Sequence, residues 1–178
     1  SLIHQGKVRD IYDIDQNKML IITTDRLSAF DVIMGEPIPH KGEVLTQMAN
    51  FWFDHLKNIP NHLTHENPED YVLVDENDQG KGRAVVVKKL RPIQIEAIVR
   101  GYIIGSGWTE YQASQSICNI SLPEGLKQAD KLPQALFTPS NKAAVGSHDE
   151  NISIPTCVKL IGQDLTDQIS KISLEIYK

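Results

Sequence analysis

A glycine and two cations stand close together near the start of the chain, in the run Gly6-Lys7-Val8-Arg9. If this run opens a strand, Lys7 and Arg9 project from the same face because they are two positions apart. Two cations on one face can neutralise a polyphosphate, and a glycine lets a phosphate approach the backbone. The alternative is a solvated hairpin edge, which these residues favour when taken alone because they match neither a Walker loop nor the kinase GxGxxG motif.

A second candidate phosphate site contains an arginine and a serine. Strand alternation places Glu96 and Arg100 on one face of an otherwise apolar segment. Buried charges are costly unless they are paired, so these two side chains either pair with each other or face a ligand. Small residues between positions 101 and 108 leave room for a phosphate, which Arg100 and the Ser106 hydroxyl would bind. The alternative is a buried ion pair followed by a glycine-rich turn.

Polar and apolar residues are interleaved in residues 24–31, directly after a predicted strand. Binding residues gather at strand ends, so Ser28 and Asp31 are candidate ligand contacts. Asp25 either binds a ligand, pairs with Arg26 or caps a turn.

Ionisable residues are also dense in residues 137–153, which include Lys142. His148 stands beside Asp149 and Glu150, and an adjacent carboxylate holds an imidazole in its charged form. Such a group can position an amine or a metal-bound water, so these four residues are the candidate catalytic residues. The alternative is that the two acids begin the following helix, where negative charge favours the N-terminal dipole.

The elements that must position the first of these residues form a mainly antiparallel sheet. Alternation in residues 7–14 and 19–23 predicts a β-hairpin. Apolar residues at helical spacing over 43–58 predict an amphipathic helix that packs on the hairpin. Apolar segments at 71–74 and 84–90 predict two strands around a solvated turn.

A second lobe begins after Arg91, because Pro92 marks a boundary before a fresh strand over residues 93–104. We therefore expect a nucleotide-covering lobe over residues 1–91 and a substrate-binding lobe over residues 92–178. The fold class is α+β, with an antiparallel β lobe followed by an α/β lobe.

The end of the chain combines a long loop with a helix. Residues 122–151 contain several prolines and little periodicity, and loops beyond roughly 12–15 residues are usually functional or mobile. From Pro155 onward, apolar residues recur at helical spacing with a break at Gly162. Because no later element completes the second core, we expect the C-terminal part of the fold to be missing.

The composition disfavours several classes of function. The 178 residues are 40% hydrophobic and 23% charged, as in globular proteins. A net charge of −5 disfavours broad binding to nucleic acid. No apolar run approaches the roughly 20 residues that cross a bilayer, and no secretory signal is visible, so we expect a cytoplasmic protein. Cys118 and Cys157 have no partners at metal-ligand spacing and are expected to be reduced thiols.

Five segments together resemble the SAICAR synthetase family in order and spacing. Each segment alone is weakly diagnostic, but five in register over nearly the whole chain indicate the family. The segments are residues 6–12, 24–31, 41–47, 96–108 and 122–153.

The resemblance implies a ligase of purine biosynthesis that uses ATP and Mg²⁺. It would join L-aspartate to carboxyaminoimidazole ribonucleotide through an acyl phosphate, giving SAICAR. The resemblance also implies a kinase-like N-terminal lobe and a second lobe of the ATP-grasp or SAICAR-synthase kind. The implied partners are small molecules, without nucleic acid or membrane, and the oligomeric state is left open.

The resemblance assigns roles to individual residues. The implied ATP-binding residues are Gly6, Lys7, Val8, Arg9, Lys88 and Leu90. The implied residues of the imidazole substrate site, where Arg100 and Ser106 hold the ribose phosphate, are Ser28, Asp31, Glu96, Arg100 and Ser106. The loop that the resemblance implies closes the site carries Lys142 and residues 148–151, namely His148, Asp149, Glu150 and Asn151.

The sequence departs from the family pattern because it lacks the family's later motifs. The family's Asp-x-Lys-x-Glu-Phe-Gly motif, its acidic Asp-Glu strand and its Ser-Arg-Phe-Trp segment do not occur before Lys178. The missing acidic motifs resemble the family's metal ligands. We therefore expect no metal site within this chain and no turnover by this chain alone. One alternative is a non-catalytic fragment that binds nucleotide or imidazole ribotide. Another is a kinase or ATP-grasp protein with a different acceptor.

Overall fold

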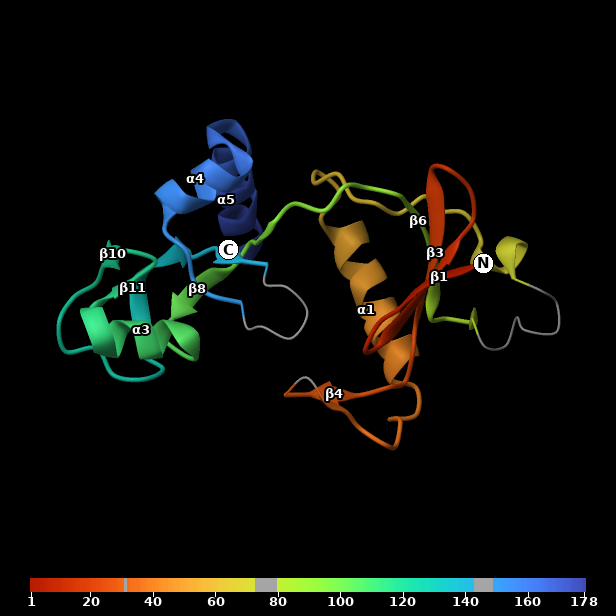
Figure 1. The fold of residues 1–178 in the computed structure, drawn as a ribbon, viewed down its shortest axis with the longest axis horizontal. Helices are drawn as coiled ribbons and strands as arrows, with labels where there is room; N and C mark the ends of the chain where they lie inside the picture. Colours follow the sequence, from red (N-terminus) through yellow and green to blue (C-terminus); the bar gives the residue numbers. More distant parts are fainter. Residues whose placement is uncertain (31, 73–79, 143–148) are drawn as a thin grey trace. The chain divides into compact units, whose positions relative to one another are not determined.

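The computed structural model describes residues 1–30, 32–72, 80–142 and 149–178. The chain divides into two compact units, Ser1–Arg91 and Pro92–Lys178, each of which is described by itself (Figure 1). Within the described ranges, the helices are all too short or too polar to cross a bilayer.

The first unit is built on a four-stranded antiparallel sheet with the order β1-β2-β3-β6. The predicted hairpin is confirmed, since β2 pairs with β3 along its whole length. The sequence did not predict β1, which pairs with β2 and forms an edge of the sheet. The strands are β1 (Leu2–Gln5), β2 (Arg9–Asp13), β3 (Lys18–Thr23) and β6 (Ala84–Lys88).

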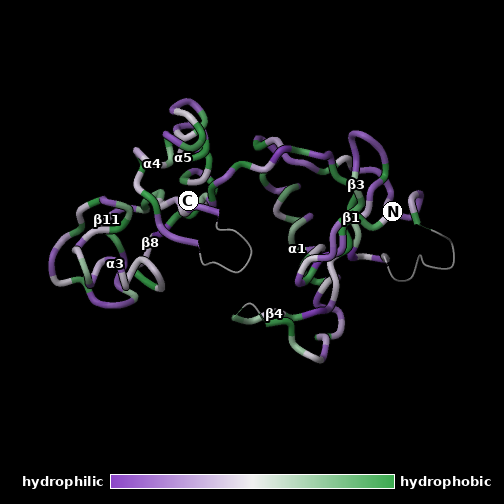
Figure 2. The backbone as a smooth tube through the Cα atoms, in the orientation of Figure 1, coloured by the Kyte–Doolittle hydropathy of each residue, from purple (hydrophilic) through white to green (hydrophobic). Residues whose placement is uncertain are grey.

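The alternation of side chains gives this sheet two different faces. One face carries the buried residues Leu20, Ala84 and Val86, which form a small core with Val72 and other apolar side chains. The opposite face is covered by α1 (Lys41–His55), which contacts β3. Figure 2 shows hydrophobic residues (green) along the strands of this sheet, which agrees with the apolar core on one of its faces.

The helix α1 packs on the sheet as predicted, but it does so with small residues. Its buried positions are Gly42 and Thr46. A Cβ added to Gly42 would lie 2.1 Å from the Thr23 carbonyl oxygen, so the helix backbone approaches β3 very closely at this point. The large apolar residues that predicted the helix are instead mostly exposed: Val44, Leu45, Met48, Phe51 and Trp52.

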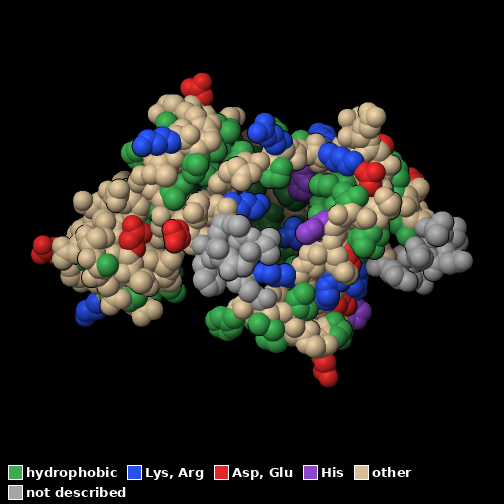
Figure 3. All heavy atoms as spheres, in the orientation of Figure 1, with side chains coloured by type: hydrophobic (Ala, Val, Ile, Leu, Met, Phe, Trp, Pro, Cys, Tyr) green, Lys and Arg blue, Asp and Glu red, His purple; other side chains and the backbone are tan. Residues whose placement is uncertain are grey.

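Two shorter elements complete the first unit. The hairpin of β4 (Ser28–Ala29) and β5 (Val32–Ile33) and the residues beside it expose large apolar side chains, including Phe30 and Met34. Figure 3 shows hydrophobic side chains (green) on the surface in this part of the first unit. The strand predicted over residues 71–74 is wrong at its start, because Tyr71 ends the 3₁₀ helix η1 (Pro68–Tyr71). Residues 73–79 lie outside the described residues.

The second unit contains short antiparallel pairs rather than the continuous strand predicted over residues 93–104. That segment is divided into β7 (Ile95–Glu96) and β8 (Val99–Tyr102), which pair with different partners. The predicted long loop is also wrong, because it contains β11 (Lys131–Phe137) and β12 (Ser140–Asn141). β11 pairs with β8 through an irregular register between Lys131 and Leu136, which accommodates Pro133 inside a strand.

Three helices cover these strands. α3 (Ser106–Ser114), which the sequence did not predict, packs on a core that includes Ile103, Ile117 and Leu132. The predicted C-terminal helix is confirmed as α4 (Ile154–Ile161) and α5 (Gln163–Tyr177), separated at Gly162 with a φ of 87°. Their apolar faces form another core with the short strands, whose buried members are Ile95, Phe137 and Cys157.

Candidate functional site

The predicted phosphate-binding run forms a tight turn between β1 and β2. The Gly6 N–H donates to the Arg9 carbonyl at 2.7 Å, and β2 begins only at Arg9. Lys7 therefore lies in the turn, and the expectation that it shares a strand face with Arg9 is wrong. The Val8 carbonyl accepts from both the backbone N–H and the hydroxyl of Thr24, each at 2.9 Å, which anchors the turn to the end of β3.

Arg26 holds the other end of this turn. Its guanidinium donates to the carbonyls of Gly6 at 3.0 Å and Lys7 at 3.2 Å. It also forms an ion pair with Asp10 at 2.6 Å, which raises the pKa of Arg26. Arg26 thus pairs with Asp10 rather than with its neighbour Asp25, and the turn is fixed before any ligand binds.

A cavity of about 330 Å³ lies between the sheet and α1. Val8 and Arg9 line it, as does His62, whose pKa is lowered mainly by burial and also by the nearby Arg9 charge. Most of the remaining wall is apolar, with side chains from β3, β6, α1 and the segment after it. These apolar residues are Ile21, Leu45, Ala49, Phe53, Leu63 and Val85.

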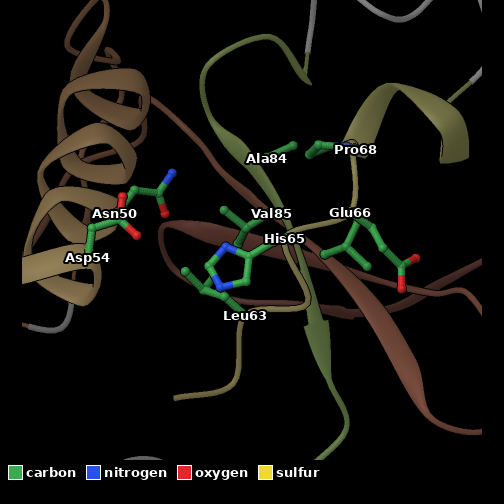
Figure 4. A pocket seen from close by; sticks show the side chains of 9 residues that line it. Asn50, Asp54, Leu63, His65, Glu66, Pro68, Ala84 and Val85 are labelled. Carbon is green, nitrogen blue, oxygen red and sulfur yellow. The ribbon is translucent and has the colours of Figure 1, made fainter. Parts of the chain in front are cut away.

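Two further cavities of the first unit lie beside the same strands. One of about 630 Å³ is lined by Lys88 together with Lys18 and Lys57. The other, of about 210 Å³, is shown in Figure 4, where Asn50 and Asp54 project from α1 toward His65. The structure thus separates Lys88 from Arg9. Among the described residues, the other predicted ATP-binding residues line none of these three cavities: Gly6, Lys7 and Leu90.

Asp25 has a structural role at the start of α1. Its carboxylate accepts from the Gly42 N–H at 2.9 Å and the His40 N–H at 3.1 Å. It also forms an ion pair with Arg83 at 2.9 Å. The Gly42 hydrogen bond is the main cause that lowers the pKa of Asp25, and Arg83 adds to it. Asp25 therefore caps the start of α1 and pairs with Arg83 rather than with Arg26.

We expect Asp25→Asn to remove an acid-sensitive part of the stability. Because the folded pKa of Asp25 is lowered, its contribution is complete above the unfolded pKa of about 3.9 and is lost as the pH falls through the folded value. The variant should lose about 1–2 kcal/mol at pH 7 and less at pH 3. Urea unfolding at both pH values measures this, with the exposed Glu36→Gln as control. An equal loss at both pH values would contradict the assignment.

The predicted substrate residues of the first unit are only partly described. Ser28 is half-buried on β4, where it pairs with Ile33 of β5. Asp31 lies outside the described residues. The structure therefore gives Ser28 a defined place in the hairpin without joining it to the cavity that contains Arg9.

In the second unit, Arg100 and Ser106 come together as predicted. The Arg100 NH2 donates to the Ser106 Oγ at 2.8 Å, and NH1 donates to the Ile104 carbonyl at 3.4 Å. Ser106 is the first residue of α3, and the N–H groups of Ser106 and Gly107 have no acceptor within the helix, whereas the Trp108 N–H already donates to the Gly105 carbonyl at 3.0 Å. The Arg100 Nε is buried and has no hydrogen-bond partner among the described residues. Cationic and neutral donors thus converge on one point, which suits an anion.

Glu96 does not take part in this arrangement. It is exposed on β7, opposite Ser140, whereas Arg100 lies on β8. The break between the two strands explains why alternation across residues 97 and 98 misplaced Glu96. The described hydrogen bonds of Arg100 lead to Ile104, Ser106 and Asn151, so a buried Glu96–Arg100 pair is not what holds it.

Two further residues complete the cluster: Asn151, which the resemblance placed only in the closing loop, and Glu110, which the sequence did not single out. Asn151 places its Oδ1 3.5 Å from both the Arg100 NH2 and the Ser106 Oγ. Its Nδ2 donates to Glu110 at 2.8 Å, and the other oxygen of Glu110 accepts from the Cys118 N–H at 2.8 Å. Glu110 follows Ser106 by four positions, so recognition of α3 would have placed both on one face.

The predicted catalytic residues lie in a segment that is described only in part. Lys142 is exposed after β12, and its N–H donates to the Gln94 carbonyl at 3.4 Å. Glu150 donates its N–H to the Asn141 Oδ1 at 2.7 Å, and Asp149 is exposed. His148 lies outside the described residues. The acids do not begin a helix, because α4 starts at Ile154 and is capped by Ser153. Within the described ranges, no group of three or more His, Cys, Asp or Glu side chains is arranged to hold a metal ion.

Comparison with known proteins gives a consistent result. The family model described as SAICAR synthetase matches residues 2–178. The phosphoribosylaminoimidazole-succinocarboxamide synthase of Methylobacillus flagellatus is 59% identical over 99% of this chain and 60% of its own length. The protein of that name from Chromobacterium violaceum is 56% identical over 99% of this chain and 62% of its own length.

A solved structure is similar over the same extent. The SAICAR-synthase from Saccharomyces cerevisiae, complexed with SAICAR, superimposes with a TM-score of 0.89 at 38% sequence identity. The match covers 99% of this chain and 60% of the yeast chain. The chain therefore has the mixed α/β fold of these proteins and spans about 60% of the length of the relatives it matches.

Proposed function

Because the chain belongs to the SAICAR synthetase family, we propose that it contributes the nucleotide and imidazole-ribotide sites of an ATP-dependent ligase of purine biosynthesis. The observation that carries the proposal is the Arg100–Ser106 pair at the start of α3, within a chain that matches the family throughout. The name that the relatives share favours the ligase over a non-catalytic binding fragment.

The proposed substrate site binds the ribose phosphate of carboxyaminoimidazole ribonucleotide. Arg100 supplies a permanent positive charge, and Ser106 supplies a hydroxyl that can turn from the guanidinium to a phosphate oxygen. The first N–H groups of α3 add donors at the positive end of the helix dipole. That the yeast relative was solved with SAICAR bound supports a ribotide as the ligand of this fold.

The proposed nucleotide site is on the first unit, whose antiparallel sheet would cover ATP in the manner of a kinase N-terminal lobe. The turn from Gly6 to Arg9 is fixed by Thr24 and Arg26, which is the preorganisation that a phosphate-covering turn needs. The apolar cavity beside Arg9 would accept a flat base, and Arg9 would offset phosphate charge. Lys88 and Leu90 remain proposed contacts at the end of β6.

The proposed reaction proceeds in two balanced steps. An oxygen of the imidazole carboxylate attacks the γ-phosphorus of ATP, and ADP leaves, which gives an acyl phosphate. The amine of L-aspartate then attacks the acyl carbon, phosphate leaves, and the nitrogen loses a proton as the amide forms. Arg9 and Arg100 would hold the two phosphorylated substrates, so their contribution is positioning and charge stabilisation.

Other parts of the proposal rest on the family. Mg²⁺ would enter with ATP, and no described residue of this chain is assigned to it. Lys142, His148, Asp149 and Glu150 remain proposed residues of the loop that closes the site. Ser28, Asp31 and Glu96 remain proposed substrate contacts, and the cytoplasm is the proposed location.

Isothermal titration calorimetry tests the nucleotide part of the proposal. We expect the chain to bind ATP–Mg²⁺, and we expect Arg9→Met to weaken binding about tenfold because one phosphate-facing charge is lost. Lys81→Met is the matched control, since Lys81 is an exposed cation of the same unit that lines none of the three cavities and should leave the affinity unchanged. Equal affinities of the parent chain and Arg9→Met would contradict the placement of the phosphates at Arg9.

A further inference from the structure

The contacts of Glu110 carry an inference that rests on the proposed ribose-phosphate site. We propose that Glu110 is a positioning residue, which acts on Arg100 and Ser106 through the amide of Asn151. Within the described chain, the side-chain hydrogen bonds of Glu110 lead to Asn151 and Cys118 rather than to the phosphate-binding pair itself.

The carboxylate of Glu110 determines which way round the Asn151 amide lies. An ionised carboxylate only accepts hydrogen bonds, so its Oε2 takes the Asn151 Nδ2 at 2.8 Å. The Asn151 Oδ1 is thereby directed at the Arg100 NH2 and the Ser106 Oγ, each 3.5 Å away. In the opposite orientation the amide would point N–H groups at a guanidinium, which has no acceptor. Glu110 thus keeps an acceptor facing the pair.

Glu110 is itself anchored to the interior of the second unit. Its Oε1 accepts the Cys118 N–H at 2.8 Å, and Cys118 is 3% exposed. Ser106 and Glu110 lie on one face of α3 because they are four residues apart. The helix and the buried turn at Cys118 therefore fix Glu110 at both ends. A residue held in this way can transmit an orientation to a side chain that meets the ligand.

The expected benefit is preorganisation of the phosphate-binding donors. The Arg100 NH2 and the Ser106 Oγ are 2.8 Å apart, so one anionic oxygen can accept from both. An acceptor beside them limits the rotamers that the guanidinium samples before binding. The loss of this acceptor should weaken ligand binding more than it weakens the fold.

Glu110→Gln tests the inference with the smallest change of shape. The glutamine oxygen can still accept from the Cys118 N–H, but its NH2 group would face Asn151 and force that amide to turn. We would titrate the parent, Glu110→Gln, Asn151→Ala and the double variant with carboxyaminoimidazole ribonucleotide by calorimetry, and measure the melting temperature of each. We expect Glu110→Gln to weaken ribotide binding about tenfold. Loss of a residue that orients a ligand-binding side chain costs roughly 10–100-fold in affinity at metal sites, and the lower value is expected here.

The double variant supplies the readout that a purely structural role would not change. If Glu110 acts through Asn151, Glu110→Gln should have no further effect on affinity in the Asn151→Ala background. Fully additive effects, or an affinity of Glu110→Gln equal to the parent, would overturn the inference. Should Glu110→Gln fail to fold, Asn151→Ala alone decides, because it leaves the Glu110–Cys118 hydrogen bond in place. Unchanged affinity in that variant also overturns the inference.

Arg100→Ala in the same series separates this inference from the proposed function. If Arg100→Ala loses the ribotide while Glu110→Gln binds like the parent, the substrate site stands and the role of Glu110 is wrong. If Arg100→Ala binds the ribotide as tightly as the parent, the substrate site is wrong and the role of Glu110 falls with it.

Discussion

Replacement of Arg100 by alanine should weaken the binding of carboxyaminoimidazole ribonucleotide roughly 100-fold, equivalent to about 3 kcal/mol. The variant removes the charged donor beside Ser106 and leaves the start of α3 to bind the phosphate alone. Calorimetric titration with the ribonucleotide and with the corresponding nucleoside measures the effect. Because the nucleoside has no phosphate, its affinity should not change in the variant.

Lys159→Ala is the matched control for this experiment. It removes one positive charge from an exposed position on α4 of the same unit, so a general electrostatic effect would appear in both variants. An equal loss of affinity for nucleotide and nucleoside in Arg100→Ala would show that the site had collapsed. That result would contradict a specific phosphate contact.

The substitution Gly42→Ala should strongly destabilise the first unit. The added Cβ would lie 2.1 Å from the Thr23 carbonyl oxygen, and a backbone atom of the central strand β3 cannot move aside as a flexible side chain can. We expect a loss of about 3 kcal/mol and a fall of roughly 10–20 °C in the melting temperature of this unit. Calorimetric melting measures both quantities.

The sign of this effect makes the test sharp. Alanine in place of glycine within a helix normally stabilises by about 1 kcal/mol, so propensity alone predicts the opposite result. Gly35→Ala is the control, because a Cβ at Gly35 would have nothing within 4 Å. A neutral or stabilising Gly42→Ala would contradict the close packing of α1 on β3.

Local patterns predicted those elements whose stability is largely local. The hairpin of β2 and β3 follows from alternation and a turn at Asp15, which accepts from the N–H groups of Asn17 and Lys18. The helices α4 and α5 follow from their apolar spacing and Gly162. In contrast, β11 was missed because Pro133 lowers strand propensity, and only the pairing with β8 reveals it.

The face that a helix buries was less predictable than the helix itself. In α1 the apolar stripe indicated the contact face, yet Gly42 and Thr46 are the buried residues. Close approach of two backbones selects small side chains, and hydropathy does not record that preference. Because small residues form the buried face of α1, the large apolar side chains of Phe51 and Trp52 remain exposed.

The candidate site shows a similar division. Arg100 and Ser106 were predicted as a pair because the segment between them is short, and the structure joins them at 2.8 Å. Glu96 was misplaced because alternation cannot anticipate a break between two strands. Glu110 was missed because α3 was not recognised. The resemblance placed Asn151 in the closing loop, but its contact with Arg100 joins segments about 50 residues apart, and a single sequence contains no signal of such a contact.

The burial of both cysteines in one unit has a practical consequence. Cys118 and Cys157 are 3% and 0% exposed, and burial, with help from the Glu110 charge, raises the pKa of the Cys118 thiol to about 11. Because both thiols are buried, a reagent such as iodoacetamide can reach them only when the second unit opens. The raised pKa of Cys118 also keeps its thiol protonated at neutral pH, and the thiolate is the form that reacts. Alkylation kinetics would thus follow transient openings of that unit without interference from the first, which contains no cysteine.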